Sequence, residues 1–487
     1  MEDSNELVFE KQEQLAFAID STYVNKTTLV TDIKKYTRTQ LQQFLQTPIK
    51  NRTKLQEISN DLFTSNGLYQ KIILYYANLL TFDHYLYPAT GTTYKNLMKN
   101  MLTASEYLDR LNIKTNCKWI AEEWLKNGEL FLYELEDNDG IILKKIPNAL
   151  CRINRNENGI LRYEIDCSKL DDKAILENGL PAEFSELLKD YKAKKAKESK
   201  LENNPSLDSD SQWREVGEKG VAFSVSMDSS NAAPVFTTLF ESMMAYSDRA
   251  TKIDDSIEAE NLKIVHLKVP TDDKGSPLMD FGVVKVYHDS AKKSLPKGVA
   301  ISTNPLDMEV FSLKNASSES IADTNLSSAC RRVMDEAGVS ASLFNGDKVT
   351  AEILKQSIIA DTSMLAKLVG QLQNWINYKM STNSKSKRFK MSFVPSTIYD
   401  KENYLRNAKD NLAYGGSRLY YLATTGLTPM EALSMLTFEI ENKIDEYLIP
   451  LQTSYTMSTS SDSEGRKTAE EKGEEVSDSA EKNRGDK

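Results

Sequence analysis

Apolar residues recur at helical spacing over 52–80, and this spacing predicts two helices separated by a sharp turn. Leu55, Ile58 and Leu62 mark the first helix, and a second, more apolar helix ends near residue 80. The turn falls at 65–67, where glycine supplies a backbone conformation that other residues resist. An aromatic run with strand character then follows, closed by a proline: Phe82, Tyr85, Leu86, Tyr87 and Pro88.

Runs typical of strands replace the helical spacing after Gly128. Apolar runs at 130–135 and 141–146 flank a turn with an Asp-Gly hairpin signal. Runs at 150–154 and 160–165 flank a second turn, and we expect all four strands to form an antiparallel meander. Because no long helix separates them, the pattern disfavours a parallel nucleotide-binding sheet.

Three long helices are predicted in the second half of the chain. Pro234, at a plausible first helical turn, begins a helix of about 28 residues over 234–261. A second helix covers 317–337 and ends at Gly338, a residue that suits a helix C-terminus. A third, very long helix is expected over 350–380.

The segment between the first two helices, 262–316, predicts a small α/β or all-β insert. Residues 264–269 alternate like a strand, and we expect further strands at 283–287 and 299–301. Beyond the third helix, shorter helices follow before the polar and charged segment 456–487. That segment has too few apolar residues to offset the entropy of ordering, and we expect it to be disordered.

Composition limits the classes of function. The chain has 487 residues and a formal net charge of -10, which disfavours a protein whose main task is to grip nucleic-acid phosphates. An acidic wall past which DNA slides remains compatible with this charge. The acidic start predicts no signal peptide, and no apolar run is long enough for a membrane span. The four scattered cysteines predict reduced, packed thiols.

The motifs of common enzyme classes are missing. There is no phosphate-binding loop, no dinucleotide glycine pattern and no Gly-x-Ser-x-Gly elbow. The histidines His84, His266 and His288 are isolated and lack metalloprotease spacing. Acidic pairs such as Asp208/Asp210 are weak metal candidates, because they fall in a linker or on a helix surface. We therefore expect no enzyme, no cofactor and no resident metal.

The order of features over 52–88 resembles the N-terminal signature of phage portal proteins. The runs NGLY at 66–69 and YANLLTFD at 76–83 carry the match, after the basic residue and leucine of Arg52 and Leu55. By the order of its predicted elements the resemblance extends from about Arg52 to Tyr447. It implies an α+β fold with wing, stem, clip and crown parts. It further implies a ring, usually of twelve copies, through which a terminase packs double-stranded DNA into a capsid.

The resemblance also implies a division of the chain. Its parts would be an N-terminal wing region (1–233), a first stem helix (234–261), a clip (262–316), a second stem helix (317–337), a tunnel loop (338–349), a wing helix and strand (350–420), a crown (421–455) and a disordered acidic tail (456–487).

Two groups of candidate residues face the DNA in this interpretation. Asn345 and Lys348 in the short loop would make light phosphate contacts, and a simple surface turn is the alternative. Acidic residues of the first stem helix would give the channel a repulsive lining, with an outward solvated face as the alternative: Asp254, Asp255 and Glu258.

Two further groups face proteins. The apolar residues Phe236, Phe240 and Met243 would be buried by neighbouring subunits, and packing inside one subunit is the alternative. Lysines of the clip would meet an acidic partner or DNA, with scattered surface charge as the alternative: Lys268, Lys285, Lys292, Lys293 and Lys297.

The implied partners are terminase, the major capsid and scaffold proteins, and head-tail adaptor or tail proteins. The implied location is the portal vertex of the virion, with assembly in the host cytoplasm and no membrane. Two alternatives stay open. One is a metal-dependent phage DNA-processing enzyme that uses Asp208, Asp254 or Glu258. The other is a structural adaptor protein that forms no ring.

Overall fold

The computed structural model has an α+β fold. It describes residues 36–89, 97–136, 140–171, 173, 175, 179–198, 212–227, 232–261, 263–272, 277–294, 299–304, 318–339, 351–382 and 386–444. The chain divides into two compact units, one that ends at Thr428 and one that begins at Pro429. The predicted acidic tail lies outside the described residues.

The first described helices match the predicted pair and its turn. After α2 (Arg38–Gln46), the chain forms α3 (Arg52–Ser65), α4 (Gly67–Leu79) and the strand β1 (His84–Pro88). Asn66 sets the turn, because its side-chain oxygen accepts hydrogen bonds of 3.0 Å from the backbone N–H groups of Leu68 and Tyr69. This cap satisfies donors that the start of a helix leaves without partners.

Two further helices lead to the main sheet. They are α5 (Leu97–Arg110) and α6 (Ile113–Asn127), and α6 ends at Gly128 in the left-handed conformation, with a φ of 73°. The N–H group of Gly128 donates to the carbonyl of Trp124 at 2.7 Å. An added Cβ at Gly128 would lie 2.0 Å from the carbonyl oxygen of Ala233, so only glycine fits there.

The main sheet has six antiparallel strands. They are β2 (Glu129–Glu136), β3 (Ile141–Ile146), β4 (Cys151–Glu157), β5 (Ile160–Asp166), β6 (Trp213–Glu215) and β7 (Gly220–Ser224). The two predicted hairpins are confirmed. The predicted meander is wrong, because β7 lies between β2 and β5 and the order is β3-β2-β7-β5-β4. Strand β7 is far along the chain, so the hairpin signals could not show this insertion.

A helix covers each face of this sheet. Helix α8 (Ala182–Glu198) packs Phe184 against Tyr133, with ring centroids 5.2 Å apart. On the other face α14 (Ala366–Thr382) places Trp375 against Phe223, at 5.7 Å. Gln371 of α14 also exchanges two hydrogen bonds with the backbone of Ser224, of 2.9 and 2.7 Å. The sheet therefore packs against a helix that follows it by more than 100 residues in sequence.

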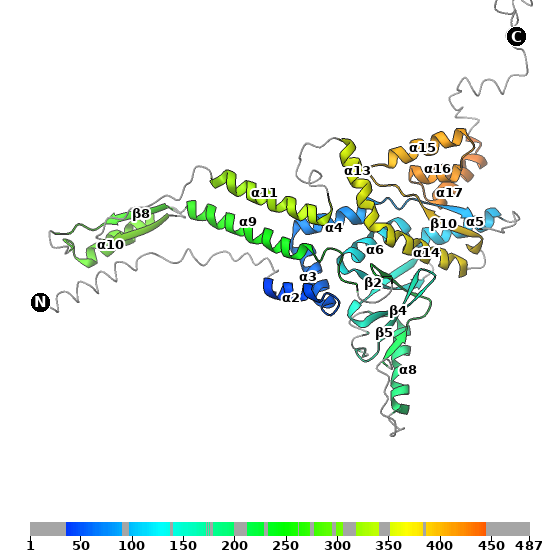
Figure 1. The fold of residues 1–487 in the computed structure, drawn as a ribbon, viewed down its shortest axis with the longest axis horizontal. Helices are drawn as coiled ribbons and strands as arrows, with labels where there is room; N and C mark the ends of the chain where they lie inside the picture. The colour runs from blue at the N-terminus through cyan, green and yellow to red at the C-terminus, as the bar shows by residue number, and fades with distance from the viewer. Residues whose placement is uncertain are drawn as a thin grey trace, which may run out of the picture. The chain divides into compact units, whose positions relative to one another are not determined.

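Two of the three predicted long helices lie side by side. They are α9 (Leu239–Asn261) and α11 (Ser318–Ala337) (Figure 1). They run antiparallel, because Ser242 near the start of α9 donates to the Glu336 carboxylate near the end of α11 at 2.5 Å. The predicted start of the first helix is wrong by five residues. Residues 234–238 instead form tight turns, with Leu239 N–H bonded to Phe236 O at 3.0 Å.

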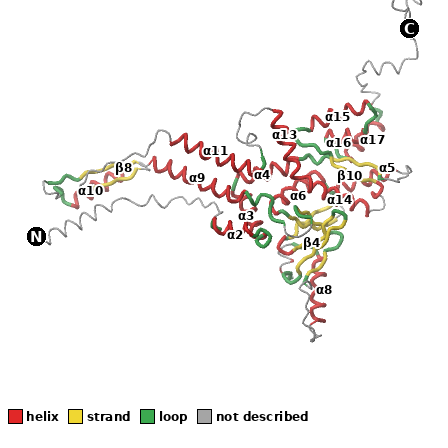
Figure 2. Tube along the Cα trace, viewed as in Figure 1, coloured by secondary structure: helices red, strands yellow, loops and turns green. Residues whose placement is uncertain are grey.

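The insert between these helices is α/β. Strands β8 (Lys263–Lys268) and β9 (Val299–Asn304) pair in parallel, and helix α10 (Phe281–Ser294) connects them (Figure 2). The predicted strand at 283–287 is wrong, since these residues lie within α10. The physical reason is topological, because parallel neighbours need a crossover of a dozen or more residues. The β-branched run between them was read as a strand from its local propensity.

The predicted third helix is interrupted. It consists of α13 (Ala351–Thr362) and α14, joined by a short 3-10 turn over Ser363–Leu365. The hydroxyl of Thr362 donates to the carbonyl of Ile359 at 2.6 Å, which competes with the regular helical bonds at this point. The single continuous helix expected over 350–380 is therefore wrong.

Shorter elements follow the interrupted helix. Strand β10 (Phe389–Phe393) pairs antiparallel with β1, and α15 (Lys401–Ala413) and α16 (Arg418–Thr425) complete the first unit. The second unit contains α17 (Pro429–Glu441), which begins at a proline. Four large apolar side chains of α17 are exposed: Met435, Leu436, Phe438 and Ile440.

Candidate functional site

The base of the helix pair rests on α4, the helix that carries the signature run. The Tyr76 hydroxyl donates to the backbone carbonyl of Ala337, the last residue of α11, at 2.9 Å. The ring of Tyr76 also packs on Phe236, at 5.4 Å between centroids, and Tyr69 packs on Phe240 at 6.0 Å. Two aromatic contacts and a hydrogen bond thus fix where α9 starts and α11 ends.

These contacts correct the prediction of a subunit interface made of Phe236, Phe240 and Met243. Their exposed fractions are 3%, 0% and 0%. The premise of an apolar stripe open to solvent is wrong for these residues, because Tyr69 and Tyr76 of the same chain cover the two phenylalanines. A second copy cannot reach side chains that are already buried, so packing inside one subunit is the correct alternative.

Tyr75, next to Tyr76 in α4, contacts a different helix, α13. The Tyr75 hydroxyl donates to the carboxylate of Asp361 in α13 at 2.7 Å. Burial raises the pKa of Asp361, although this hydrogen bond opposes the increase. Adjacent residues of α4 therefore hold the helix before residue 338 and the helix after residue 350. The helices on both sides of the predicted tunnel loop thus contact one turn of α4, and Asp361 lies at the end of α13 rather than next to the loop.

An ion pair and a hydrogen bond of Arg52 connect the start of the signature segment to the sheet. Arg52 pairs with the fully buried Glu129 at the start of β2, at 2.9 Å, and also donates to the carbonyl of Cys151 at 3.2 Å. Burial raises the pKa of Glu129 to about 7, although the Arg52 charge opposes the increase. The segment is thus fixed to the sheet as well as to the helix pair.

Asp83, the last residue of the signature run, lies between two lysines. Its carboxylate is 2.7 Å from the Lys114 ammonium and 3.0 Å from that of Lys401. Burial disfavours the ionised form, but the hydrogen bonds from both lysines lower the pKa of Asp83 below its usual value. Lys114 also donates to the carbonyl of Gly426, so the cluster joins α6, α15 and the end of α16.

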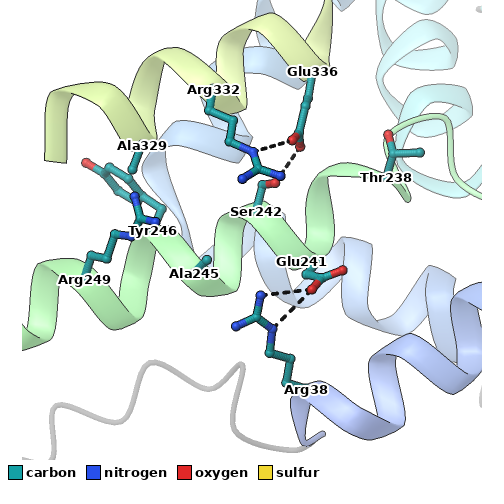
Figure 3. Close-up of a pocket in the computed structure, with 10 residues that line it drawn as sticks. All are labelled: Arg38, Thr238, Glu241, Ser242, Ala245, Tyr246, Arg249, Ala329, Arg332 and Glu336. Atoms are coloured by element: carbon teal, nitrogen blue, oxygen red, sulfur yellow. Dashed lines mark hydrogen bonds and ion pairs between the residues drawn. The ribbon is translucent and has the colours of Figure 1, made fainter. Parts of the chain in front are cut away.

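A cavity of about 450 Å³ opens between α2, α9 and α11 (Figure 3). Two ion pairs of 2.9 Å line it, one between Arg38 and Glu241 and one between Arg332 and Glu336. A third arginine, Arg249, lines the cavity and is exposed. The paired charges compensate each other. Ser242 donates its hydroxyl to the Glu336 carboxylate, and the residues that line the cavity include no histidine. Two of the three arginines that line the cavity are thus paired with carboxylates of the same cavity.

The residues predicted to face DNA are not brought together by the described geometry. Asp254, Asp255 and Glu258 belong to α9, but their side chains lie outside the description. Asn345, Lys348 and the clip residue Lys297 also lie outside it. The channel lining and the loop contact therefore stay predictions.

Four of the five lysines predicted for a clip belong to one small unit. Lys268 ends β8, and Lys285, Lys292 and Lys293 belong to α10; all four are exposed. The sequence prediction missed an apolar surface on the same unit, formed by Leu278, Met279, Val283, Val286 and Tyr287. Helical spacing was the available signal, since residues 283, 286 and 287 share a face only if this segment is a helix.

Neither a metal centre nor a membrane span is found in the described part of the chain. No group of three or more His, Cys, Asp or Glu residues is close enough there to hold a metal ion. No helix among the described residues is long and apolar enough to cross a bilayer. All four cysteines are free thiols, and three of them are buried. Asp208, a residue of the metal-enzyme alternative, lies outside the described ranges.

Comparisons of the chain with models of protein families and with curated proteins gave no match. The functional interpretation therefore rests on the residues and the geometry of this chain.

Proposed function

We propose that this chain is a portal-type subunit. Copies of it would form a ring, with about twelve subunits implied by the resemblance, around a channel for double-stranded DNA at one vertex of a phage capsid. Terminase would dock there during packaging, and head-tail connector proteins would dock afterwards. The major capsid and scaffold proteins would contact the ring during assembly.

One observation carries this proposal. The antiparallel pair α9 and α11 is interrupted by the small unit β8-α10-β9, and its base is fixed by the signature residues Tyr69 and Tyr76. The signature run and the element order were separate reasons for the resemblance. Their direct contact supports the resemblance, because residues of the signature run form the base on which the predicted stem helices rest.

Exposed apolar surface supports assembly with further copies or partners. Helix α17 exposes Phe438 and Ile440, and α10 exposes Val286 and Tyr287. Monomeric proteins rarely leave contiguous apolar patches of this kind open, and such patches mark interaction sites. Because Phe236, Phe240 and Met243 are buried, α10 and α17 are the candidate contact surfaces instead.

The charge of the chain fits a channel rather than a tight DNA clamp. A net charge of -10 per copy repels phosphate, and a ring multiplies this effect. The acids Asp254, Asp255 and Glu258 would contribute to such a lining, and Lys348 with Asn345 would supply the light contacts. No catalytic role is part of this proposal.

The test is the mass and symmetry of the purified full-length chain, by native mass spectrometry and by class averages of stained particles. We expect a closed ring of about twelve subunits with a central hole. The same preparation is incubated with double-stranded DNA and Mg²⁺ or Mn²⁺. A closed dimer over the whole concentration range, or metal-dependent cleavage of the DNA, would overturn the proposal in favour of an adaptor or an enzyme.

A further inference from the structure

Two neighbouring tyrosines of α4 hold two different helices, and only one of these contacts contains a group that titrates. The Tyr76 hydroxyl donates to the backbone carbonyl of Ala337 at 2.9 Å. The Tyr75 hydroxyl donates to the carboxylate of Asp361 at 2.7 Å. A peptide carbonyl has the same charge at every pH used for proteins, whereas a carboxylate loses its charge when it binds a proton. The contact with α11 is therefore independent of protonation, and the contact with α13 depends on it.

Asp361 is a buried carboxyl group with no cation beside it in the described part of the chain. Its exposed fraction is 6%, and its hydrogen-bond partner is the neutral Tyr75 hydroxyl. None of the ion pairs between described residues includes it. The residues three and four positions away in the chain are uncharged: Ser357, Ile358, Met364 and Leu365. Buried carboxylates normally have a cation or a metal as neighbour, because burial disfavours the ionised form.

The groups of α4 that face Asp361 are also uncharged. Burial raises the pKa of Tyr75 and of Tyr76, and the neighbouring Asp361 acts in the same direction, so both hydroxyls keep their protons. Tyr399, which lies close to Tyr75, brings a third hydroxyl and no positive charge. Burial raises the pKa of Asp361 above its ordinary value of 3.8, and the hydrogen bond from Tyr75 opposes this increase only in part. Asp361 therefore binds its proton more tightly in the folded chain than in the unfolded one.

The helix that carries Asp361 ends directly after it. Helix α13 stops at Thr362, and a 3-10 turn over Ser363–Leu365 separates it from α14. Helix α14 is fixed to the main sheet through Gln371 and Trp375. A change of the contact at Asp361 therefore acts on α13 and leaves α14 on the sheet.

We propose that Asp361 and Tyr75 form a proton-controlled latch between α13 and α4. With a proton on Asp361 the buried pair is neutral, and α13 stays on α4. Loss of this proton leaves a buried negative charge without a cation, which favours movement of Asp361 toward water and weakens the contact. By linkage, the contact is strongest below the ordinary pKa of the carboxyl group and weakens as the pH rises. The latch lies within one chain, so it does not depend on the proposed ring.

The test is hydrogen exchange of the full-length chain, followed by mass spectrometry, between about pH 4 and about pH 7. Each measured rate is divided by the intrinsic rate of the same amide at that pH, which gives its protection. We expect the amides of α13 to lose protection as the pH rises. The amides of Gly338 and Val339 are the internal control and should keep theirs, because the Tyr76 contact beside them involves no titratable acceptor.

Three variants check the latch. Asp361→Asn cannot ionise, and we expect it to keep α13 protected over the whole pH range. Tyr75→Phe removes the hydrogen bond that favours the ionised form, so the loss of protection should move to higher pH. Glu352→Gln is the matched control, because Glu352 is an exposed carboxyl group of the same helix. In this variant the loss should occur at the same pH as in the unmodified chain.

Each outcome supports or rejects the latch. Protection of α13 that does not change with pH in the unmodified chain overturns the proposal, and so does a loss that persists in Asp361→Asn. If Asp361→Asn does not fold, the direction of the change in Tyr75→Phe decides. Native mass spectrometry of the same samples reports the ring separately. A ring without pH-dependent protection rejects this inference alone, and pH-dependent protection without a ring rejects the proposed function alone.

Discussion

The hydroxyl of Tyr76 donates a hydrogen bond of 2.9 Å to the backbone carbonyl of Ala337, across 261 residues of sequence. Both residues are buried, and the bond falls where α11 ends and Gly338 takes up a left-handed φ of 74°. It joins the helix of the signature run to the last turn of the helix pair. Tyr76 of this run thus has a structural role at the base of the helix pair.

Removing this hydroxyl should weaken the end of α11. We expect Tyr76→Phe to lower the free energy of unfolding by about 1 kcal/mol, because the carbonyl of Ala337 is left without a partner while the ring contact with Phe236 stays. Hydrogen exchange should also become faster at the amides of Gly338 and Val339. Tyr87→Phe is the control, since Tyr87 is partly exposed, and equal effects of both changes would contradict this account.

Phe240 is predicted to stabilise the chain itself rather than a ring. Phe240→Ala removes a fully buried ring that packs on Tyr69, and we expect a loss of about 3–5 kcal/mol in urea unfolding. Phe438→Ala, at an exposed phenylalanine of α17, should change the stability by less than about 0.5 kcal/mol. If Phe240→Ala left the chain stable and only abolished assembly, its burial inside one chain would be disproved.

Glu129 should make the stability fall as the pH rises. Its folded-state pKa is about 7, above its ordinary value of 4.5, so between these values the folded state holds a proton that the unfolded state has released. The contribution is complete below about pH 4.5 and is lost by about pH 7, a decrease of about 3 kcal/mol. Glu129→Gln should flatten this part of a stability–pH profile measured by urea unfolding. An unchanged slope in the variant would assign the dependence to other groups.

Gly128 is expected to tolerate no side chain. In Gly128→Ala the new Cβ would meet the carbonyl oxygen of Ala233 at a residue with a φ of 73°. The left-handed backbone alone costs about 1–2 kcal/mol, and the close contact adds to this cost. Gly67→Ala is the matched control, because nothing lies within 4 Å of its added Cβ and alanine favours the start of α4. Melting temperatures that fall equally for both variants would contradict this prediction.

The sequence by itself determined most of the local elements. Helical spacing located α3 and α4, turn residues located the two hairpins, and Gly338 marked the end of α11. These features depend on residues close together in the chain, whose propensities and periods can be read directly. The missed element, α10, shows the limit, because a run rich in valine was assigned to a strand from local preference alone.

Only the tertiary structure decided which residues meet. The insertion of β7 between β2 and β5, the burial of Phe236 and Phe240 under α4, and the Tyr76–Ala337 bond all join distant segments. An amphipathic pattern states that a helix face must be covered, but it does not state whether the same chain or a second copy covers it. That choice depends on long-range packing, which buried the stripe of α9 and left the outer face of α10 open.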